Sequence, residues 1–260
     1  MVISRRNALV LSAVAAAGLP VTRAQAAIKT QWVDYQHGDT ALRGYLAYDE
    51  SLSGKRPAVL LIHRRDGMSA LTLQNAEMVA KQGYVVFAAD IFGRDHQPKD
   101  VPAQIEASGA MNKDRPLMRA RTQAGFDILK QNPLTDTARI ATLGYCFGGT
   151  VVIEFAETGA PVVGTVTIHG SFRDFTPGAA KNIAGRVLIL HGSEDPVAPL
   201  NEVDLLVKEL RAAKVSWELN LYSGTEHGFS TPKNAAEERA NTESQVAAAR
   251  FFKEVFGIAV

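Results

Sequence analysis

The chain has 260 residues, of which 46% are hydrophobic and 21% are charged, and its net charge is +1. This composition is that of a globular protein with enough apolar residues for one large core. A charge so close to zero gives no electrostatic reason to expect nucleic acid or an anionic membrane surface as a partner, so neither is predicted.

The first residues read as an export signal rather than as part of the fold. A basic start is followed by an Ala/Val/Leu-rich stretch and an Ala-Gln-Ala cleavage site. Arg5 and Arg6 lie in a segment that resembles the twin-arginine signal; the alternative is an ordinary secretory signal that carries two arginines. Arg23 closes the apolar stretch before it is long enough to span a bilayer. The prediction is a signal peptide at 1–26 and one domain at 27–260, exported to the bacterial periplasm and free of the membrane after cleavage.

Beyond the signal, short β-branched runs alternate with segments of helical periodicity. The expected strands are, in chain order, 32–36, 41–49, 57–63, 84–90, 138–145, 162–170, 186–192 and 215–222. The first two alternate between apolar and polar residues, which is typical of a hairpin at a sheet edge. The third and fourth are continuous apolar runs, as in strands buried on both faces. The expected helices are 71–83, 116–131, 150–159, 200–213 and 235–256.

Such regular alternation predicts an α/β fold with a doubly wound, mostly parallel sheet and helices on both faces. The longest piece without clear periodicity is 93–116, which follows a strand. Loops that cover the substrate lie at this place in such folds, so this segment is expected to be one of them.

The only cysteine lies between a predicted strand and a predicted helix, in the motif Gly144-Tyr145-Cys146-Phe147-Gly148. This is the G-x-nucleophile-x-G pattern of a nucleophile elbow, with Cys in place of the usual Ser. Glycine is needed on either side because a Cβ there would clash with the neighbouring strand and helix. The helix N-terminus favours a thiolate, and the amide of Phe147 can donate to an oxyanion. The alternative is a buried structural cysteine in a glycine-rich turn.

Two downstream residues supply the other parts of an acyl-transfer site. Asp195 follows the strand 186–192 and His227 follows the last strand, so both are expected at the sheet edge where Cys146 lies. The order nucleophile, acid, base is that of hydrolases with this topology. His227 is expected to accept the thiol proton and pass it to the leaving alkoxide, while Asp195 fixes the imidazole tautomer. Glu194 is the weaker alternative for the orienting acid.

The motif G-x-C-x-G-G, followed by G-x-x-D and a late His-Gly-Phe, resembles the dienelactone hydrolase family, and the likeness runs from residue 57 to the last helix. The resemblance implies an α/β-hydrolase fold. It also implies hydrolysis of a carboxylic ester or lactone through a thioester acyl-enzyme, without metal or cofactor. The expected substrate is a small ester or lactone, with anionic ones among the candidates. The expected assembly is a monomer or a small homo-oligomer.

Two further positions match the family's pattern. Arg94, which ends the segment Asp-Ile-Phe-Gly-Arg after a strand, resembles the family's arginine for the substrate carboxylate; the alternative is a solvated loop arginine. In the family, the loop after the strand at 57–63 supplies a second oxyanion amide. Here that amide maps to Arg64 or Arg65.

The sequence also departs from the family in two places. The archetypal enzymes carry a glutamate that hydrogen-bonds the resting thiol, and this chain has Arg64 at that position. A cation there favours the thiolate or attracts an anionic substrate, and Asp66 is a candidate for the missing acid. The family's second arginine, shortly after its histidine, is absent from residues 228–232, which read Gly-Phe-Ser-Thr-Pro. These departures leave the natural substrate open.

The remaining histidines have simpler expected roles. His63, His169 and His191 each end a strand, where hydrogen bonding to the backbone is usual, although the rim of the site is within their reach. His37 and His96 are expected to be solvated. No pair has the spacing of metal ligands, so no metal is predicted.

Two rival functions stay open. The same triad serves thioesterases and peptidases, which a panel of esters, lactones, thioesters and peptides separates. The other rival is a non-catalytic binding or thiol-sensing protein in which Arg64 has disabled the triad. In that case Cys146 would titrate near about 8.5, the ordinary pKa of a thiol.

Overall fold

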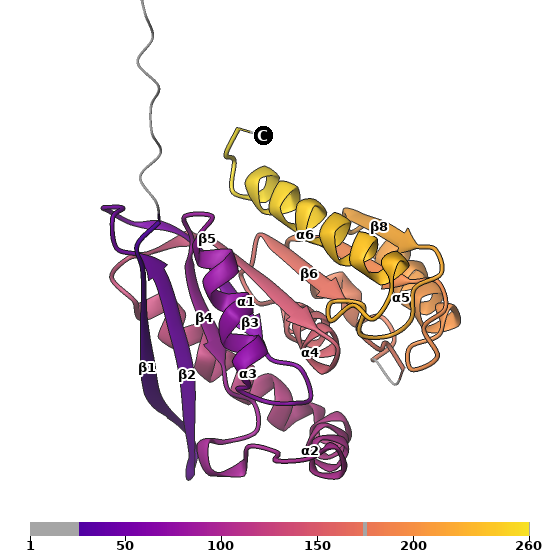
Figure 1. Ribbon diagram of the computed structural model, residues 1–260, viewed down its shortest axis with the longest axis horizontal. Coiled ribbons are helices and arrows are strands. Elements are labelled where there is room, and N and C mark those ends of the chain that lie inside the picture. The colour runs from indigo at the N-terminus through magenta and orange to yellow at the C-terminus, as the bar shows by residue number, and fades with distance from the viewer. Residues whose placement is uncertain (1–25, 174–175, 260) are drawn as a thin grey trace, which may run out of the picture.

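The computed structural model describes residues 26–173 and 176–259, and Figure 1 shows a twisted sheet with helices packed against it. In this part of the chain eight strands form the sheet, in the order β1-β2-β4-β3-β5-β6-β7-β8. The predicted mostly parallel α/β architecture is confirmed. The predicted signal at 1–26 lies outside the described residues except for Ala26.

The hairpin predicted at the sheet edge is β1 with β2, which pair antiparallel, and β2 also runs antiparallel to β4. All strands from β3 to β8 are parallel to one another. The bounds are β1 (Ile28–His37), β2 (Thr40–Asp49), β3 (Arg56–Ile62), β4 (Val85–Ala89), β5 (Thr135–Tyr145), β6 (Gly164–Ile168), β7 (Arg186–Gly192) and β8 (Trp217–Tyr222).

Helices cover both faces of the sheet. One face packs against α1 (Ala70–Ala80) and α6 (Ala235–Val255). The other face packs against α3 (Arg115–Gln131), α4 (Phe147–Ala156) and α5 (Leu200–Ala212). Two short 3-10 turns lie at Arg94–His96 and Ala179–Asn182.

Strand β3 shows why the sequence carries uninterrupted apolar runs. Val59 and Leu61 pack in the core with α1 and α6, whereas Leu60 and Ile62 pack in the core with α3 and α4. Successive side chains of a strand point to opposite faces, so a strand covered on both faces needs apolar residues at every position. Every residue of β3 is indeed buried.

The direction of the connections changes at the centre of the sheet. β3 leads to β4 on one side, β5 leads to β6 on the other, and β3 and β5 are neighbours. Ligands of such sheets bind in the crevice at the carboxyl ends of the strands where the order reverses. Cys146 directly follows β5 and lies at this crevice.

The expectation of a loop at 93–116 is wrong. Most of the segment is α2 (Val101–Lys113), and the Asp100 carboxylate caps it by accepting a hydrogen bond from the Ala103 amide at 2.9 Å. Met111 is the one buried residue of this helix. Since α2 presents no apolar stripe to a core, the sequence lacks the periodicity by which helices are recognised.

Candidate active site

Cys146 occupies a strained turn between β5 and α4. Its backbone has φ 54° and ψ −120°, and a positive φ is uncommon for residues other than glycine. A Cβ on Gly144 would lie 2.0 Å from the Gly148 carbonyl oxygen. A Cβ on Gly148 would lie 2.4 Å from the Ile62 carbonyl oxygen. Both obstacles are backbone atoms, so the turn requires both glycines, as the sequence predicted.

Cys146, His227 and Asp195 form one hydrogen-bonded chain of side chains. His227 Nε2 lies 3.1 Å from Cys146 Sγ, and His227 Nδ1 lies 2.8 Å from Asp195 Oδ2. The other oxygen of Asp195 accepts hydrogen bonds from the amides of Val197 and Ala198, both at 2.9 Å. The structure therefore brings the three predicted residues together, one each from the loops after β5, β7 and β8.

The alternative acids lie elsewhere. Glu194 accepts a hydrogen bond from the Ser193 hydroxyl at 3.1 Å. Asp66 accepts one from the Ser69 hydroxyl at 3.0 Å, at the start of α1. Neither carboxylate is hydrogen-bonded to His227 or Cys146 among the described residues, so neither replaces Asp195 or stands in for the family's glutamate in this structure.

Burial and the neighbouring charges shift the pKa values of Cys146, His227 and Asp195 in opposite directions. Burial alone raises the pKa of the Cys146 thiol, whereas the hydrogen bond and positive charge of His227 lower it. Arg64 and the Phe147 amide lower that pKa further, so it falls below its ordinary value. Burial lowers the pKa of His227, yet its hydrogen bonds to Asp195 and Cys146 raise it to about 9. Burial raises the pKa of Asp195, and the hydrogen bonds from His227 and backbone amides keep it below the usual value. These directions favour a thiolate–imidazolium pair at neutral pH.

Of the predicted oxyanion donors, the Phe147 amide contacts Cys146. Phe147 is the first residue of α4, where amides have no acceptor in their own helix, and its N–H interacts with Cys146. Arg64 and Arg65 follow β3 in a turn that the Gly67 amide closes by donating to the Arg64 carbonyl at 3.1 Å. In residues 26–173 and 176–259, no oxygen accepts a hydrogen bond from the amide of Arg64 or Arg65.

The side chain of Arg64 extends toward the loop that carries His227. Its Nη1 donates to Thr231 Oγ1 at 3.3 Å, and its Nε is buried without an acceptor among the described residues. This cation lies close enough to Cys146 for its field to stabilise the thiolate.

Cys146 and His227 open into a cavity of about 310 Å³. One wall is α2, through residues 105 to 112, so the segment 93–116 does cover the site, as a helix instead of the expected loop. Three arginines also line this cavity: Arg65, Arg115 and Arg173.

Two of these arginines already have acidic partners. Arg115 Nη1 lies 3.2 Å from Glu154, and Arg173 Nε lies 3.1 Å from Glu202. No carboxylate pairs with Arg65 within the described part of the chain, so Arg65 is the cation available to a bound anion. Sequence reasoning missed Arg115 and Arg173, because Arg115 begins a helix and Arg173, although it lies in the loop after β6, belongs to no motif.

Arg94, the expected substrate arginine, is not brought to this site. Its Nε and Nη2 pair with the neighbouring Asp95, both at 3.2 Å. It lines a separate cavity of about 330 Å³ with Trp32 and Arg43. The reason is local: Gly93 has φ 117°, which turns the chain into the 3-10 turn that carries Arg94 away from Cys146.

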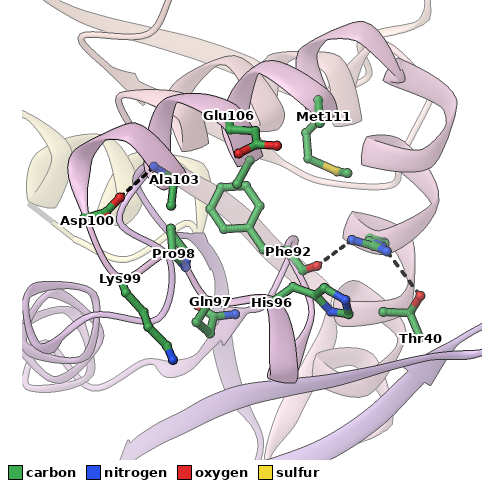
Figure 2. A pocket seen from close by; sticks show the side chains of 13 residues that line it. Thr40, Phe92, His96, Gln97, Pro98, Lys99, Asp100, Ala103, Glu106 and Met111 are labelled. Atoms are coloured by element: carbon green, nitrogen blue, oxygen red, sulfur yellow. Dashed lines mark hydrogen bonds between the residues drawn. The ribbon is translucent and has the colours of Figure 1, made fainter.

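A larger cavity of about 700 Å³ is lined by other residues of α2 than those that line the cavity at Cys146. Figure 2 shows this larger cavity. Phe92 and Met111 supply apolar walls there. The guanidinium of Arg121 donates to the carbonyls of Ile91 and Phe92, both at 2.8 Å. Neither Cys146 nor His227 lines this larger cavity.

Among the described residues, no three His, Cys, Asp or Glu side chains are grouped as metal ligands would be. In the same part of the chain, no helix has both the length and the apolar character needed to cross a membrane.

Comparison with known proteins places this architecture in a family. The family model described as dienelactone hydrolase family matches residues 42–256. A solved structure, a dienelactone hydrolase-like promiscuous phosphotriesterase from metagenomic libraries, is similar with a TM-score of 0.83 and 31% identity, over 88% of this chain and 99% of that one. Hydrolase tropI of Talaromyces stipitatus is 29% identical over 192 residues, which are 69% of this chain and 73% of that protein. A carboxymethylenebutenolidase homolog of Mus musculus is 24% identical over 155 residues, 59% of this chain and 62% of that protein.

The family match extends from β2 to the end of α6 and includes the three loops that carry Cys146, Asp195 and His227. The similar solved structure supports the same α/β-hydrolase fold over nearly its whole length. This chain belongs to the dienelactone hydrolase family and is a hydrolase with an α/β-hydrolase fold.

Proposed function

We propose that this protein hydrolyses a small carboxylic ester or lactone, with Cys146 as nucleophile, His227 as general base and acid, and Asp195 as the orienting acid. The observation that carries the proposal is the 3.1 Å contact between His227 Nε2 and Cys146 Sγ in a nucleophile elbow, backed by Asp195 on the far side of the imidazole. Such a contact activates a thiol as a nucleophile without a cofactor.

In the first half of the reaction, the Cys146 thiolate attacks the carbonyl carbon and a C–S bond forms. The amide of Phe147 and that of Arg64 or Arg65 donate to the oxygen as it becomes negative, each worth roughly 3 kcal/mol of transition-state stabilisation. The imidazolium of His227 gives its Nε2 proton to the leaving alkoxide as the C–O bond breaks. Asp195 holds Nδ1 and stabilises the charged ring.

In the second half, water replaces the alcohol. Neutral His227 takes a proton from this water, and the oxygen attacks the thioester carbonyl. The same amides hold the second oxyanion until the C–S bond breaks and returns the electron pair to sulfur. The acid leaves, and the thiolate–imidazolium pair is restored.

The cavity lining supports a substrate that carries both a negative charge and an apolar group. Arg65 supplies a cation without an acidic partner in the described chain. Ile105 and Val197 also line the cavity although they are 57% and 45% exposed, so they place aliphatic surface at its opening. Burying such a group of the substrate against them is favourable.

The direct test is turnover of p-nitrophenyl acetate by the protein and by Cys146→Ala and His227→Ala. We expect both variants to lose at least about a thousandfold in kcat, because each removes a member of one catalytic unit. A transient acetyl adduct on Cys146, seen by mass spectrometry after rapid quenching, is expected in the unsubstituted protein and not in Cys146→Ala. Equal turnover in all three proteins would rule out the proposed chemistry.

A second experiment separates the rival functions. The panel contains an ester, a lactone, a thioester and a peptide with the same acyl group, and the ester or lactone is expected to have the highest kcat/KM. A non-catalytic thiol-sensing protein would turn over none of them. The lowered pKa of Cys146 and the open cavity support the catalytic reading.

We also propose that residues 1–26 direct export of the protein by the twin-arginine route. The support is the Arg5-Arg6 pair ahead of an apolar stretch and a small-residue cleavage site. Cell fractionation of the full chain and of a variant with both arginines changed to lysine tests this. Mature protein in the periplasm only for the unsubstituted chain is expected, whereas equal export of both would indicate an ordinary secretory signal.

A further inference from the structure

His169 is a buried residue that the reaction above does not use. It directly follows β6, is 0% exposed, and has φ 42°, one of three positive φ values among non-glycine residues in the described chain. Another of the three is Cys146. Positive φ at a non-glycine residue persists only where surrounding contacts enforce it, and such residues cluster at functional sites.

One nitrogen of the His169 ring contacts the backbone of the nucleophile. The Cys146 N–H donates to His169 Nδ1 at 3.1 Å and also to the Ile168 carbonyl at 3.0 Å. Because Nδ1 accepts a hydrogen bond from an amide, it carries no proton, and the tautomer is fixed with its proton on Nε2.

The other nitrogen contacts the loop that carries the base. His169 Nε2–H donates to Ser230 Oγ at 2.9 Å, three residues after His227. The ring therefore bridges two loops, from the Cys146 amide to the Ser230 hydroxyl.

The His169 ring also packs against the ring of His227, the proposed base. The rings of His169 and His227 lie with centroids 4.9 Å apart at an interplanar angle of 60°, and Phe229 packs against His169 at 5.1 Å. His169 thus packs directly against the ring of the proposed base.

The ring must be neutral to serve in this way. Burial, and then the positive charges of His227 and Arg64, hold the pKa of His169 well below its ordinary value. A proton on Nδ1 would point at the Cys146 N–H and break that hydrogen bond, and a second cation would face the His227 imidazolium.

We propose that His169 is a positioning residue for the hydrolysis proposed above: its neutral ring holds the Cys146 backbone in its positive-φ turn and keeps the His227 ring at contact distance from the sulfur. Chain position and burial alone indicate only a histidine satisfied by backbone at a strand end. The contacts to both loops of the reacting pair are what go beyond that role.

The experiment compares His169→Asn with His169→Leu, which have similar size and shape. Asn offers Oδ1 as acceptor for the Cys146 amide and tolerates positive φ, whereas Leu does neither. For p-nitrophenyl acetate we expect kcat to fall about a hundredfold in His169→Leu, the effect of a misplaced reacting group, with KM changed less than about twofold. His169→Asn should recover part of this loss.

The pH dependence of iodoacetamide alkylation at Cys146 is the second readout. A displaced His227 ring stabilises the thiolate less, so the alkylation midpoint should shift to higher pH in His169→Leu, and less in His169→Asn. A purely structural role would lower the melting temperature and leave the midpoint and the kcat of the folded protein unchanged.

Two further variants keep the test decisive. Ser230→Ala removes only the far end of the bridge and is expected to give a smaller shift in the same direction; if His169→Leu fails to fold, an unchanged kcat and midpoint in Ser230→Ala overturn the proposal. Thr165→Val is the control, because it removes a buried hydrogen bond between Thr142 and Thr165, 3.1 Å long, in the same sheet and is expected to change stability only. If no ester is turned over while the alkylation shifts are seen, the proposed function fails and the positioning role stands.

Discussion

The two cavities on either side of α2 differ in size and in chemistry, and the smaller one carries the groups that we propose react. The larger cavity, about 700 Å³, is bounded by Phe92, Met111 and the buried Arg121, whose Nη1 and Nη2 donate to backbone carbonyls and to Thr40, while its Nε has no acceptor among the described residues. The smaller cavity, about 310 Å³, holds Cys146 and His227. Volume therefore does not identify the site in this protein.

What distinguishes the smaller cavity is its place in the sheet. Strands β5, β7 and β8 are parallel, so their carboxyl ends lie at one edge, and the loops that follow them bring Cys146, Asp195 and His227 to one point. The larger cavity is bordered by α2 and by the segment after β4. Making the same substitution at each of the two cavities and comparing the effects on activity tests this difference.

The largest expected effect compares the same substitution at the two cavities. Asp195→Asn leaves the shape of the site but favours the wrong tautomer of His227, so kcat for an ester is expected to fall by about 10⁴-fold. Asp100→Asn, at the larger cavity, keeps a good helix cap and is expected to leave kcat within about twofold. Steady-state kinetics measure both, and similar losses in the two variants would contradict the assignment.

The next largest expected effect is on the free energy of unfolding, and it compares two glycine-to-alanine substitutions. In Gly148→Ala the new Cβ would lie 2.4 Å and 2.7 Å from the carbonyl oxygens of Ile62 and His63, so the protein is expected to lose about 3 kcal/mol or more of unfolding free energy. Gly109 lies within α2 with nothing within 4 Å of its Cβ position, and Gly109→Ala is expected to add roughly 0.5–1 kcal/mol. Urea unfolding of the two variants tests the opposite signs.

The pH dependence follows from the directions of the two pKa shifts. His227 holds its proton below about pH 9 and loses it above, so protonation of the leaving group weakens as the pH rises through that value. Cys146 is a thiolate above its lowered pKa and regains its proton as the pH falls through it. The acylation rate is therefore expected to reach a plateau between the two limits and to fall on both sides.

Removing the imidazole of His227 should raise the pH at which Cys146 becomes a thiolate. In His227→Ala the sulfur loses its hydrogen bond and its neighbouring cation, so the alkylation midpoint of Cys146 is expected to move to higher pH. His96→Ala, at the larger cavity, is expected to leave the midpoint in place. An unchanged midpoint in His227→Ala would mean that the two residues are not electrostatically linked.

The smallest effect concerns the cations. Arg65→Gln is expected to raise KM for an anionic ester, such as the p-nitrophenyl hemiester of succinate, by about fivefold, the worth of roughly 1 kcal/mol from one partly solvated charge pair. KM for neutral p-nitrophenyl butyrate should not change. Arg94→Gln should alter neither KM. If KM for the anionic ester rose in Arg94→Gln and not in Arg65→Gln, Arg94 would again be the substrate arginine.

The sequence was sufficient where local pattern and topology act together. Gly144 and Gly148 carry the signature of the turn, and the alternation of strands and helices was enough to place Asp195 and His227 at the same edge as Cys146. Apolar runs such as that of β3 predict strands well because burial on both faces leaves no other pattern.

The sequence was insufficient where the position of a residue or helix depends on tertiary contacts. α2 has one buried residue and hence no periodic stripe, so it was expected to be a loop. The path of Arg94 depends on the φ of Gly93, which residue types do not specify because glycine adopts both signs. Arg115 and Arg173 reach the cavity from elements that no motif links to Cys146.

Cys146 is the only sulfhydryl among these 260 residues, and it is ionised more readily than an ordinary thiol. A thiolate reacts with peroxide to give a sulfenic acid, which many redox proteins rescue by forming a disulfide with a nearby resolving cysteine. This chain contains no such second cysteine. Oxidative inactivation should therefore be reversed only by a thiol from outside the molecule, and continued exposure should carry the sulfur on to the irreversible sulfinic acid.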